Sequence, residues 1–532
     1  MRPDLTGVDP LAFNLATRLS VGDLLTRSAF QFPDRAAIVQ DGEEISYARL
    51  DASSEAFGRG LLDAGLQRQE PVALLVGNSW RFVASFFGCA KAALVALPMN
   101  LMLPPEEVAW ILADAGVRAV VADPAFVPLL EQILPDLPQV TTVVVTGETS
   151  GSVAGRTALR WDDLATDPTP LQVVIEDRDT LHCLYTSGTT ARPKGVLTSH
   201  LAVHVAALST ALQVGHRHGE EFSVAPIVLP LFHTTALDTL LVPVLLTGGT
   251  AILPQGFQPE AYLDIVESRR ATHLLLLPMM WAALLATPKL DERDLSSVRL
   301  CMYAMAPMPQ ERIGRIAAAF PKADVLLGSG QTECVPATVI QWPAHQDNKS
   351  ASWGPAVVTV DARMMGPAGD LLPRGETGEI VYRGPHVMSG YWNNSAANTE
   401  AFAHGWFHSG DIGHLDDEGV VWFSDRLKDI VKTGGENVSS VEVERVLLSS
   451  PEITEVAVIG LSDDRWGEAV TAVVVAVDPD VDPAHLSERL IAMCREHLAG
   501  FQVPKRIEVL TGLPKTATGK IQKHELRELF RA

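Results

Sequence analysis

One stretch of the chain concentrates groups that could surround a phosphate. Residues 184–195 read Leu-Tyr-Thr-Ser-Gly-Thr-Thr-Ala-Arg-Pro-Lys-Gly, so hydroxyls and a glycine precede two basic side chains. Backbone N–H groups and hydroxyls in such a loop can cradle a phosphate chain, and Arg192 and Lys194 add positive charge. It is not a Walker A loop, because Lys194 precedes the last glycine instead of following it. Taken alone, the stretch fits an ordinary polar surface loop equally well.

Four more stretches carry polar groups at large separations along the chain. Two of them lie where the sequence predicts a strand end and a domain junction. In order they are Gly328-Ser-Gly-Gln-Thr-Glu333, Ser409-Gly-Asp411, Asp425-Arg-Leu-Lys-Asp-Ile-Val-Lys-Thr-Gly-Gly-Glu-Asn437 and Pro514-Lys-Thr-Ala-Thr-Gly-Lys520.

The bulk composition limits the classes of function. The chain has 532 residues, of which 47% are hydrophobic and 20% charged, which is ordinary for a globular protein of at least two domains. Its formal net charge of −22 disfavours binding to nucleic acid or to an anionic membrane. A protein this acidic must build any nucleotide site from a few local cations.

Cysteine usage and hydropathy predict a cytoplasmic protein. Five cysteines are scattered without a C-x-x-C pair, which argues against disulfides and structural zinc and suits a reducing compartment. The first twenty residues carry Asp4 and Asp9 and lack the apolar core of a signal peptide. The longest apolar stretches, 82–103 and 274–286, are interrupted, so we expect no integral membrane segment.

The elements that must position these motifs alternate between strands and helices. Short apolar strands and helical segments alternate over residues 24–123 and again over 204–327, which predicts an α/β fold with two doubly wound lobes. The predicted elements include a strand at 36–39, helices at 80–94 and 235–246 and, nearer the C-terminus, a strand at 506–510. From about residue 351 the composition favours a small antiparallel β region. Beyond Arg426 the pattern predicts a compact α+β domain. We therefore expect domains at 1–425 and 426–532.

Together and in this order, the five stretches resemble the acyl-adenylate-forming (AMP-binding) superfamily, and within it acyl-CoA synthetases of the fatty-acyl-CoA or 4-coumarate-CoA ligase type. The resemblance covers residues 24–531. It implies a mobile C-terminal domain and ATP, Mg²⁺ and coenzyme A as cofactors. The implied reaction joins a carboxylic acid to the α-phosphate of ATP, releasing pyrophosphate, and then transfers the acyl group from AMP to coenzyme A.

The resemblance also implies roles for the residues of the first two motifs. Glu333 matches a magnesium-binding glutamate, Thr332 an α-phosphate contact beside it, and Gln331 belongs to the same nucleotide-binding motif. The phosphate loop is expected to hold the β- and γ-phosphates, with Thr186 also near the metal; its matching residues are Thr186, Ser187, Gly188, Thr189, Thr190 and Lys194.

Residues nearer the C-terminus complete the implied site. Asp411 matches an acceptor for both ribose hydroxyls, and Arg426 a ribose and phosphate contact. Lys428 matches the hinge of the small domain, although an exposed linker lysine is the alternative. Lys520 matches the mobile-domain lysine that neutralises charge during adenylation.

Two further sets of residues are implied to contact the thiol acceptor and the carboxylic acid. Gly434 and Gly435 match a loop that lines the thiol tunnel, and Lys432 a contact to coenzyme A phosphates. His233, in Pro230-Leu-Phe-His233, matches a position near the carboxylate, although a lone histidine is more often structural.

The sequence departs from the family pattern at a few positions. Ala191 replaces a glycine, Ser329 an aromatic residue that packs on adenine, and Ala304 and Met305 smaller residues of the acyl pocket. Added bulk in that pocket predicts a medium-chain or compact aryl acid. Two alternatives stay open: a ligase of the same fold that loads a carrier-protein thiol, and a non-catalytic nucleotide-binding homologue, which the departures at Ala191, Ala304 and Ser329 motivate. A homodimer is allowed.

Overall fold

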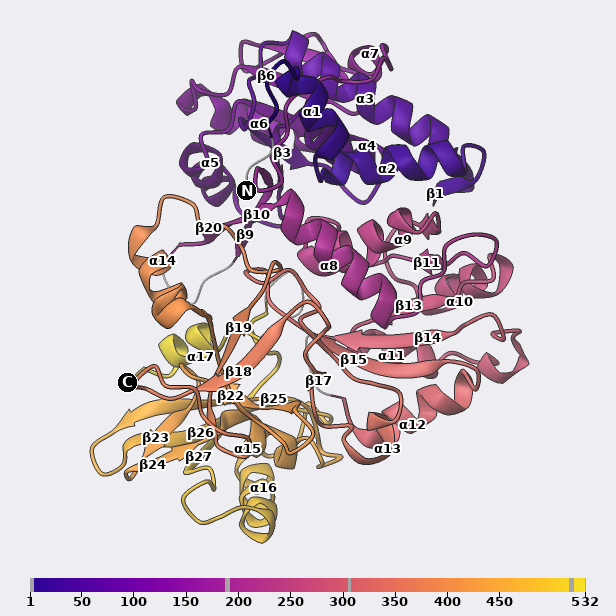
Figure 1. The fold of residues 1–532 in the computed structure, drawn as a ribbon. Coiled ribbons are helices and arrows are strands. Elements are labelled where there is room, and N and C mark those ends of the chain that lie inside the picture. The colour runs from indigo at the N-terminus through magenta and orange to yellow at the C-terminus, as the bar shows by residue number, and fades with distance from the viewer. Residues whose placement is uncertain (1–3, 187–191, 305–307, 516–520, 532) are drawn as a thin grey trace. The chain divides into compact units, whose positions relative to one another are not determined.

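The computed structural model describes residues 4–186, 192–304, 308–515 and 521–531, which form two compact units (Figure 1). The large unit contains the described residues up to Asp361 together with Tyr382–Ala401. The small unit contains Ala362–Val381 and the described residues from Phe402 onward. The α/β class with a large N-terminal and a smaller C-terminal part, expected from the sequence, is confirmed. The predicted boundary at 425/426 does not coincide with this division and stays a prediction.

The first sheet of the large unit has nine strands in the order β20-β10-β9-β4-β3-β5-β6-β8-β7. Its centre is parallel, and β10 runs antiparallel to both β9 and β20. Parallel strands buried on both faces are apolar throughout, as expected for βα units. The strands are β3 (Pro71–Leu75), β4 (Val95–Pro98), β5 (Ala119–Ala122), β6 (Thr142–Val145), β7 (Ser152–Val153), β8 (Arg156–Arg160), β9 (Thr180–Thr186), β10 (Lys194–Ser199) and β20 (Gly390–Tyr391).

Two of the helices between these strands begin at residue types that favour a helix N-terminus. The hydroxyl of Ser79 accepts the Phe82 N–H and caps the following helix, and Pro105 opens another in its first turn. The helices of this region are α3 (Tyr47–Asp63), α4 (Trp80–Lys91), α5 (Pro105–Asp114), α6 (Val127–Ile133), α7 (Trp161–Leu164) and α14 (Ser395–Ala401), with short turns η1 (Pro124–Phe126), η2 (Leu134–Asp136) and η5 (Ala403–Gly405), the last in the small unit.

The second predicted series of strands divides between two four-stranded sheets. One has the order β13-β14-β15-β16 and the other β11-β12-β1-β2, in which β1 pairs in parallel with β12. The expected strand at 36–39 therefore joins the later series, because its partner is set by a long-range contact that local pattern does not encode. The strands are β1 (Ala36–Gln40), β2 (Glu43–Ser46), β11 (Val224–Pro226), β12 (Thr250–Ile252), β13 (His273–Leu276), β14 (Leu300–Ala304), β15 (Asp324–Ser329), β16 (Val339–Ile340) and the short β17 (Gly354–Pro355).

Some helices of this second region contribute to an apolar cluster that includes Trp281, Phe320 and Leu276. Another helix starts as a π-helical turn, a rare form that occurs often at functional sites. The elements are α8 (His200–Gln213), the π-helical turn η3 (Thr235–Leu241), α9 (Val242–Leu246), α10 (Pro259–Ser268), α11 (Pro278–Leu285), η4 (Leu290–Glu292), α12 (Gln310–Ala319) and α13 (His345–Asn348).

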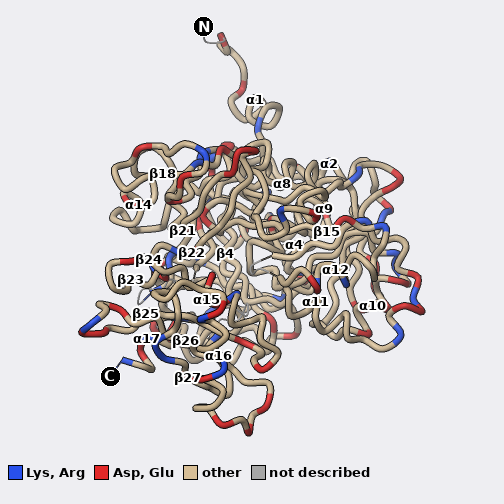
Figure 2. Tube along the Cα trace, turned by 90° about the horizontal axis from the view of Figure 1, so that it is seen from below, with Lys and Arg blue, Asp and Glu red and all other residues tan. Residues whose placement is uncertain are grey.

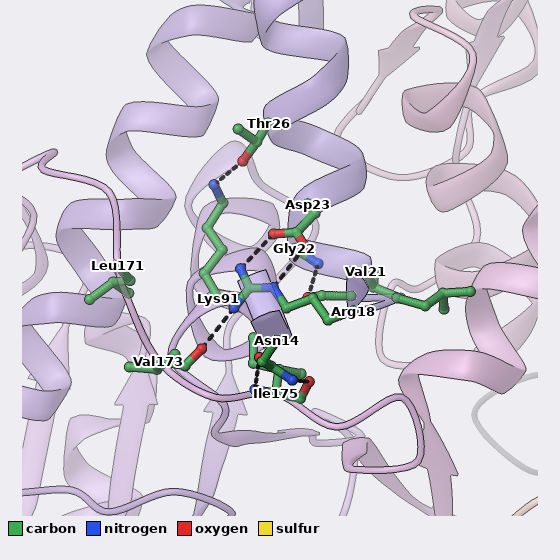
Figure 3. Close-up of polar contacts among 12 residues, drawn as sticks. Asn14, Arg18, Val21, Gly22, Asp23, Thr26, Lys91, Leu171, Val173 and Ile175 are labelled. Atoms are coloured by element: carbon green, nitrogen blue, oxygen red, sulfur yellow. Dashed lines mark hydrogen bonds and ion pairs between the residues drawn. The ribbon is translucent and has the colours of Figure 1, made fainter. Parts of the chain in front are cut away.

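Two N-terminal helices, α1 (Pro10–Thr17) and α2 (Val21–Gln31), are tied to a later segment by polar contacts (Figure 3). Asn14 exchanges hydrogen bonds with the backbone of Ile175 at 2.9 and 3.1 Å. Arg18 forms a two-point ion pair with Asp23 and donates to the Val173 carbonyl at 2.7 Å. These contacts fix the start of the described chain against the segment that leads into β9.

The small unit contains two antiparallel-rich sheets. The first has the order β22-β21-β19-β18, and the second the order β24-β23-β26-β25 with β27 parallel to β26. Val458, Val474, Leu486 and Leu490 belong to the buried core of the second sheet and its helices. The elements are β18 (Asp361–Met365), β19 (Gly378–Arg383), β21 (Phe407–Leu415), β22 (Val420–Arg426), β23 (Val431–Thr433), β24 (Glu436–Val438), β25 (Ile453–Asp463), β26 (Gly467–Ala476), β27 (Arg506–Leu510), α15 (Ser440–Leu447), α16 (Pro483–His497) and α17 (Lys523–Leu529).

Charge, cysteines and hydropathy follow the sequence expectations. All five cysteines lie in the described part of the chain, where they are buried and free of disulfides. Acidic residues are interspersed with basic ones along the chain (Figure 2). Within the described ranges, no helix is both long and apolar enough to cross a membrane.

Candidate functional site

The predicted phosphate loop connects the two strands of a hairpin in the large unit. Thr186 ends β9 and Lys194 begins β10, and the register places them opposite each other. The Thr186 hydroxyl donates to the Lys194 carbonyl at 3.4 Å. The hairpin therefore sets the two ends of the loop at a fixed separation. Five residues of the motif lie outside the described residues, namely Ser187, Gly188, Thr189, Thr190 and Ala191.

The predicted magnesium ligand follows the end of β15. Gln331, Thr332 and Glu333 are half-buried in the turn after the strand. The Cys334 N–H donates to the Gln331 carbonyl at 3.1 Å, and the Met388 N–H donates to the Glu333 carbonyl at 2.8 Å. The backbone that carries these three side chains is thus held from both sides, at a strand end where α/β sheets place their ligands.

One residue that the sequence did not single out joins these two motifs. Tyr391 lies on β20, beside β10, and its hydroxyl donates to Glu333 Oε1 at 3.0 Å. The Lys194 ammonium lies 4.9 Å from the centre of the Tyr391 ring. The structure therefore brings the predicted phosphate-binding lysine and the predicted metal-binding carboxylate together through one phenol.

The environment of Tyr391 keeps its hydroxyl a neutral donor. Burial, and next the negative charge of Glu333, raise the pKa of Tyr391 above its ordinary value. A neutral phenol is a hydrogen-bond donor, so it can hold a carboxyl oxygen of Glu333 in a fixed position.

The segment that carries His233 is held by Asn78, a second residue that no sequence motif had indicated. Asn78, after β3, donates to the Leu229 carbonyl at 2.9 Å and accepts the Leu231 N–H at 2.8 Å. His233 is half-buried in the next turn, where its Nδ1 accepts the Thr235 N–H at 3.2 Å. The ring is thus oriented by its own turn, with Nε2 left to other contacts.

A buried polar contact connects the turn after His233 to the strand before the phosphate loop. His182, on β9, lies 3.2 Å from Asp238 in the π-helical turn, and both side chains are essentially unexposed. The Thr234 hydroxyl donates to the same carboxylate at 2.7 Å. Since Asp238 sits in the helix that His233 precedes, the pair fixes that helix relative to β9.

In the small unit, the structure brings two predicted ribose contacts together. Asp411, on β21, and Arg426, on β22, are register partners, and Arg426 Nε lies 3.3 Å from Asp411 Oδ1. Asp411 is 3% exposed, and Arg426 is half-buried. A buried carboxylate oriented by an arginine is a suitable acceptor for a pair of hydroxyls.

The remaining predicted residues of the small unit are more exposed. Lys428 is exposed, and its carbonyl accepts from Arg527 at 3.5 Å. Lys432 is an exposed residue of β23. Gly434 and Gly435 form the tight turn between β23 and β24, with φ of 59° and 89°, where a side chain would be strained. Lys520 lies outside the described residues.

The side chains around Glu333 can be compared with the ligands that a magnesium ion prefers. In the described part of the chain, no cluster of three or more His, Cys, Asp or Glu side chains could hold a metal by itself. Magnesium, however, is usually bound by one or two carboxylates together with substrate phosphates and water. The half-buried Glu333, which Tyr391 links to Lys194, fits that arrangement.

Comparisons with known proteins cover nearly the whole chain. A family model described as AMP-binding enzyme matches residues 25–392, and one described as AMP-binding enzyme C-terminal domain matches 442–520. A feruloyl-CoA synthase of Amycolatopsis is 35% identical over 96% of this chain and 99% of its own. A long-chain-fatty-acid–CoA ligase of Mycobacterium tuberculosis is 32% identical over 96% and 99%. The crystal structure of an anthranilate CoA ligase in complex with anthranoyl-AMP is 28% identical, covers 97% of this chain and 99% of that one, and has a TM-score of 0.86.

Proposed function

The chain belongs to the AMP-binding enzyme family, and on that premise we propose how its residues carry out the reaction of an acyl-CoA synthetase. The enzyme is an ATP-dependent, AMP-forming acid–thiol ligase. It joins a carboxylic acid to ATP as acyl-AMP, releasing pyrophosphate, and then forms a thioester with coenzyme A. The observation that carries the assignment of roles is the contact of Glu333 with Tyr391 beside Lys194.

The first step needs charge stabilisation more than proton transfer. A carboxylate is already a nucleophile, so no general base is required, while charge develops on the phosphates. Lys194 and the hydroxyls of residues 186–190 hold the β- and γ-phosphates. Thr332 contacts the α-phosphate, and Lys520 neutralises charge as the new bond forms. His233 orients the incoming carboxylate.

A magnesium ion bound by Glu333, with Thr186 nearby, would supply charge neutralisation on the phosphates. Glu333 is suited to this role because Tyr391 holds one of its oxygens in place. Gln331, in the same turn, contributes to the nucleotide site from a backbone that is held at both ends.

The small unit supplies ribose and coenzyme A contacts. Asp411 accepts hydrogen bonds from the ribose hydroxyls, and Arg426 orients Asp411 while contacting ribose or phosphate. Lys428 is the hinge about which the mobile C-terminal domain, from residue 426, turns between the two steps. The exposed Lys432 meets coenzyme A phosphates, and the glycine turn at 434–435 lets the pantetheine chain approach the backbone.

The acid is a medium-chain or compact aryl acid. The pocket strand β14 ends in Tyr303 and Ala304, which are buried at 1% and 7% exposure, so the position usually held by glycine is filled. Met305 lies outside the described residues. The relatives named for ferulate and anthranilate support an aryl acid as the substrate. The relative named for long-chain fatty acids supports a fatty acid instead.

The experiment that tests the function is acid-dependent exchange of pyrophosphate into ATP, followed by thioester formation. A panel of aryl acids and of fatty acids from C6 to C16 is assayed with coenzyme A and, separately, with a phosphopantetheinylated carrier protein. We expect exchange with every accepted acid and a thioester on coenzyme A. Thioester formation only on the carrier would reassign the acceptor, C16 as best substrate would overturn the predicted acid class, and absence of exchange would favour a non-catalytic homologue.

Two predictions from the sequence remain proposals. We propose a homodimer, which light scattering coupled to size-exclusion chromatography would test. We also propose a cytoplasmic location, which cell fractionation would test.

A further inference from the structure

We propose that Tyr391 is a positioning residue that sets Glu333 and Lys194 at the separation needed to bind a metal–nucleotide complex. The inference rests on the proposed function, in which Glu333 binds the divalent cation and Lys194 the leaving phosphates. It adds a third residue that links those two roles through two different parts of one side chain, the hydroxyl and the ring.

The two contacts use different parts of the tyrosine side chain, the hydroxyl and the ring face. The hydroxyl donates to Glu333 Oε1 at 3.0 Å, across 58 residues of sequence. The ring face lies 4.9 Å from the Lys194 ammonium, within the range of cation–π attraction. A single rigid group therefore holds the carboxylate and restrains the ammonium.

The backbone of Tyr391 is fixed on both sides. On one side it pairs with Val196 of β10, the strand that Lys194 begins. On the other, the Asn398 side chain accepts the Tyr391 N–H at 2.7 Å and donates to the Tyr391 carbonyl at 3.0 Å. Preorganisation of this kind places a functional side chain without an entropic cost at the moment of binding.

The double contact predicts that the hydroxyl and the ring have separable effects. Removal of the hydroxyl frees the Glu333 carboxylate and should weaken metal binding. Removal of the ring also takes away the surface that restrains Lys194, and it should weaken nucleotide binding even without metal. A role limited to packing would reduce both affinities together, or neither.

The test measures binding in the full chain with Mn²⁺ as the probe for Mg²⁺ and a non-hydrolysable ATP analogue. Free Mn²⁺ is followed by electron paramagnetic resonance, and metal-free analogue binding by calorimetry. We expect Tyr391→Phe to weaken Mn²⁺ binding to the nucleotide complex about tenfold and to change metal-free analogue binding less than about twofold. Tyr391→Leu should give the same metal effect and an additional loss of about threefold to tenfold in metal-free analogue affinity.

Tyr47→Phe is the matched control. The Tyr47 hydroxyl donates to the Gly249 carbonyl at 2.6 Å in the same large unit, in the region of the β11-β12-β1-β2 sheet. This variant should lower the melting temperature without changing either affinity, which separates lost stability from lost positioning. In steady state, Tyr391→Phe should raise the Mg²⁺ concentration for half-maximal exchange, and saturating Mg²⁺ should restore most of kcat.

The outcomes distinguish a failure of the positioning role from a failure of the proposed function. If the wild-type chain binds the Mn²⁺–analogue complex and Tyr391→Phe binds it equally well, the positioning role is wrong and the proposed function stands. If Tyr391→Phe weakens both affinities in parallel with a melting shift like that of Tyr47→Phe, Tyr391 is only structural. If the wild-type chain does not bind the complex, the proposed function fails and the inference fails with it.

Discussion

The large and small units hold their predicted site residues in different ways. In the large unit, Lys194 and Glu333 are half-buried at strand ends and restrained by Tyr391. In the small unit, Asp411 is buried beside Arg426, but Lys428 and Lys432 are exposed. The large unit therefore holds its predicted phosphate- and cation-binding groups in a fixed arrangement, whereas the small unit presents charges on its surface. This difference suits a reaction in which one unit keeps the nucleotide and the other delivers charge and a second substrate.

The large unit also contains buried histidines whose pKa values are lowered. Burial lowers the pKa of His200 to about 3 and those of His204 and His273 to about 4. His273 Nε2 donates to the Val214 carbonyl, and His200 Nδ1 accepts the Val21 N–H, so both rings are part of the interior. The fold of this unit thus depends on neutral imidazoles.

The sharpest test of the comparison is Lys520→Ala. If the small unit supplies the charge that stabilises the adenylation transition state, loss of this lysine should reduce acid-dependent pyrophosphate exchange by about 10²- to 10³-fold. Thioester formation from chemically prepared acyl-AMP should be much less affected. Lys515→Ala, a nearby lysine that pairs with Glu455, is the control and should keep most of the activity. Unchanged exchange in Lys520→Ala would remove the small unit from the adenylation mechanism.

Acidification should separate the stabilities of the two units. A histidine whose pKa is lower in the fold than in the unfolded chain stabilises the fold fully above the unfolded pKa of about 6.5 and loses that contribution as the pH falls toward 4. At pH 5, each of His204 and His273 should cost on the order of 2 kcal/mol of unfolding free energy. Hydrogen exchange between pH 7.5 and 5 should show peptides of the large unit losing protection first.

The variant His204→Gln is the control for this pH dependence. It removes one titrating ring, so the loss of stability between pH 6.5 and 4 should become shallower than in the wild-type chain. An equal loss of protection in both units would show that the buried histidines do not determine acid stability.

Asp411→Asn should affect ATP without affecting coenzyme A. The amide replaces one acceptor oxygen by a donor, so one ribose hydrogen bond and the attraction to Arg426 are weakened. We expect the KM for ATP to rise about tenfold and the KM for coenzyme A to stay within about twofold. Steady-state kinetics with each substrate varied would check this. A parallel rise in both KM values would contradict a dedicated ribose role.

Lys432→Ala should produce the smallest effect and the opposite selectivity. An exposed lysine that meets a phosphate contributes little in water, so we expect the KM for coenzyme A to rise about threefold. Pyrophosphate exchange should be unchanged, because it does not involve coenzyme A. Arg465→Ala, a nearby cation that stacks on Trp466, is the comparison variant. A loss of exchange in Lys432→Ala would place this lysine in the first step.

The sequence predicted the local elements well because their signals are local. The helix expected at 80–94 is observed as Trp80–Lys91, and the strand expected at 506–510 has those bounds. The family and reaction class are confirmed, since the motifs that carry the resemblance are short and keep their order. The roles of the individual site residues stay predictions.

What the sequence could not supply depends on contacts between distant residues. Tyr391 meets Glu333 across 58 residues, and Asn78 brackets a segment about 150 residues later. A lone tyrosine after a glycine, or an asparagine after a strand, carries no signal until the sheet order is known. The π-helical turn at 235–241 was expected only as helix, because its wider hydrogen bonding leaves no mark in the apolar spacing.

The pairing of β1 with β12 has a consequence for biosynthesis. The Thr250 hydroxyl donates to the Ala36 carbonyl across 214 residues, and β1 is buried between β2 and β12. On a ribosome that adds about 5–20 residues per second, the hairpin of β1 and β2 therefore waits roughly 10–40 s with one apolar edge unpaired. An edge of this kind is a template for wrong pairing. We therefore expect the nascent chain to need protection of this edge until β12 has been synthesised.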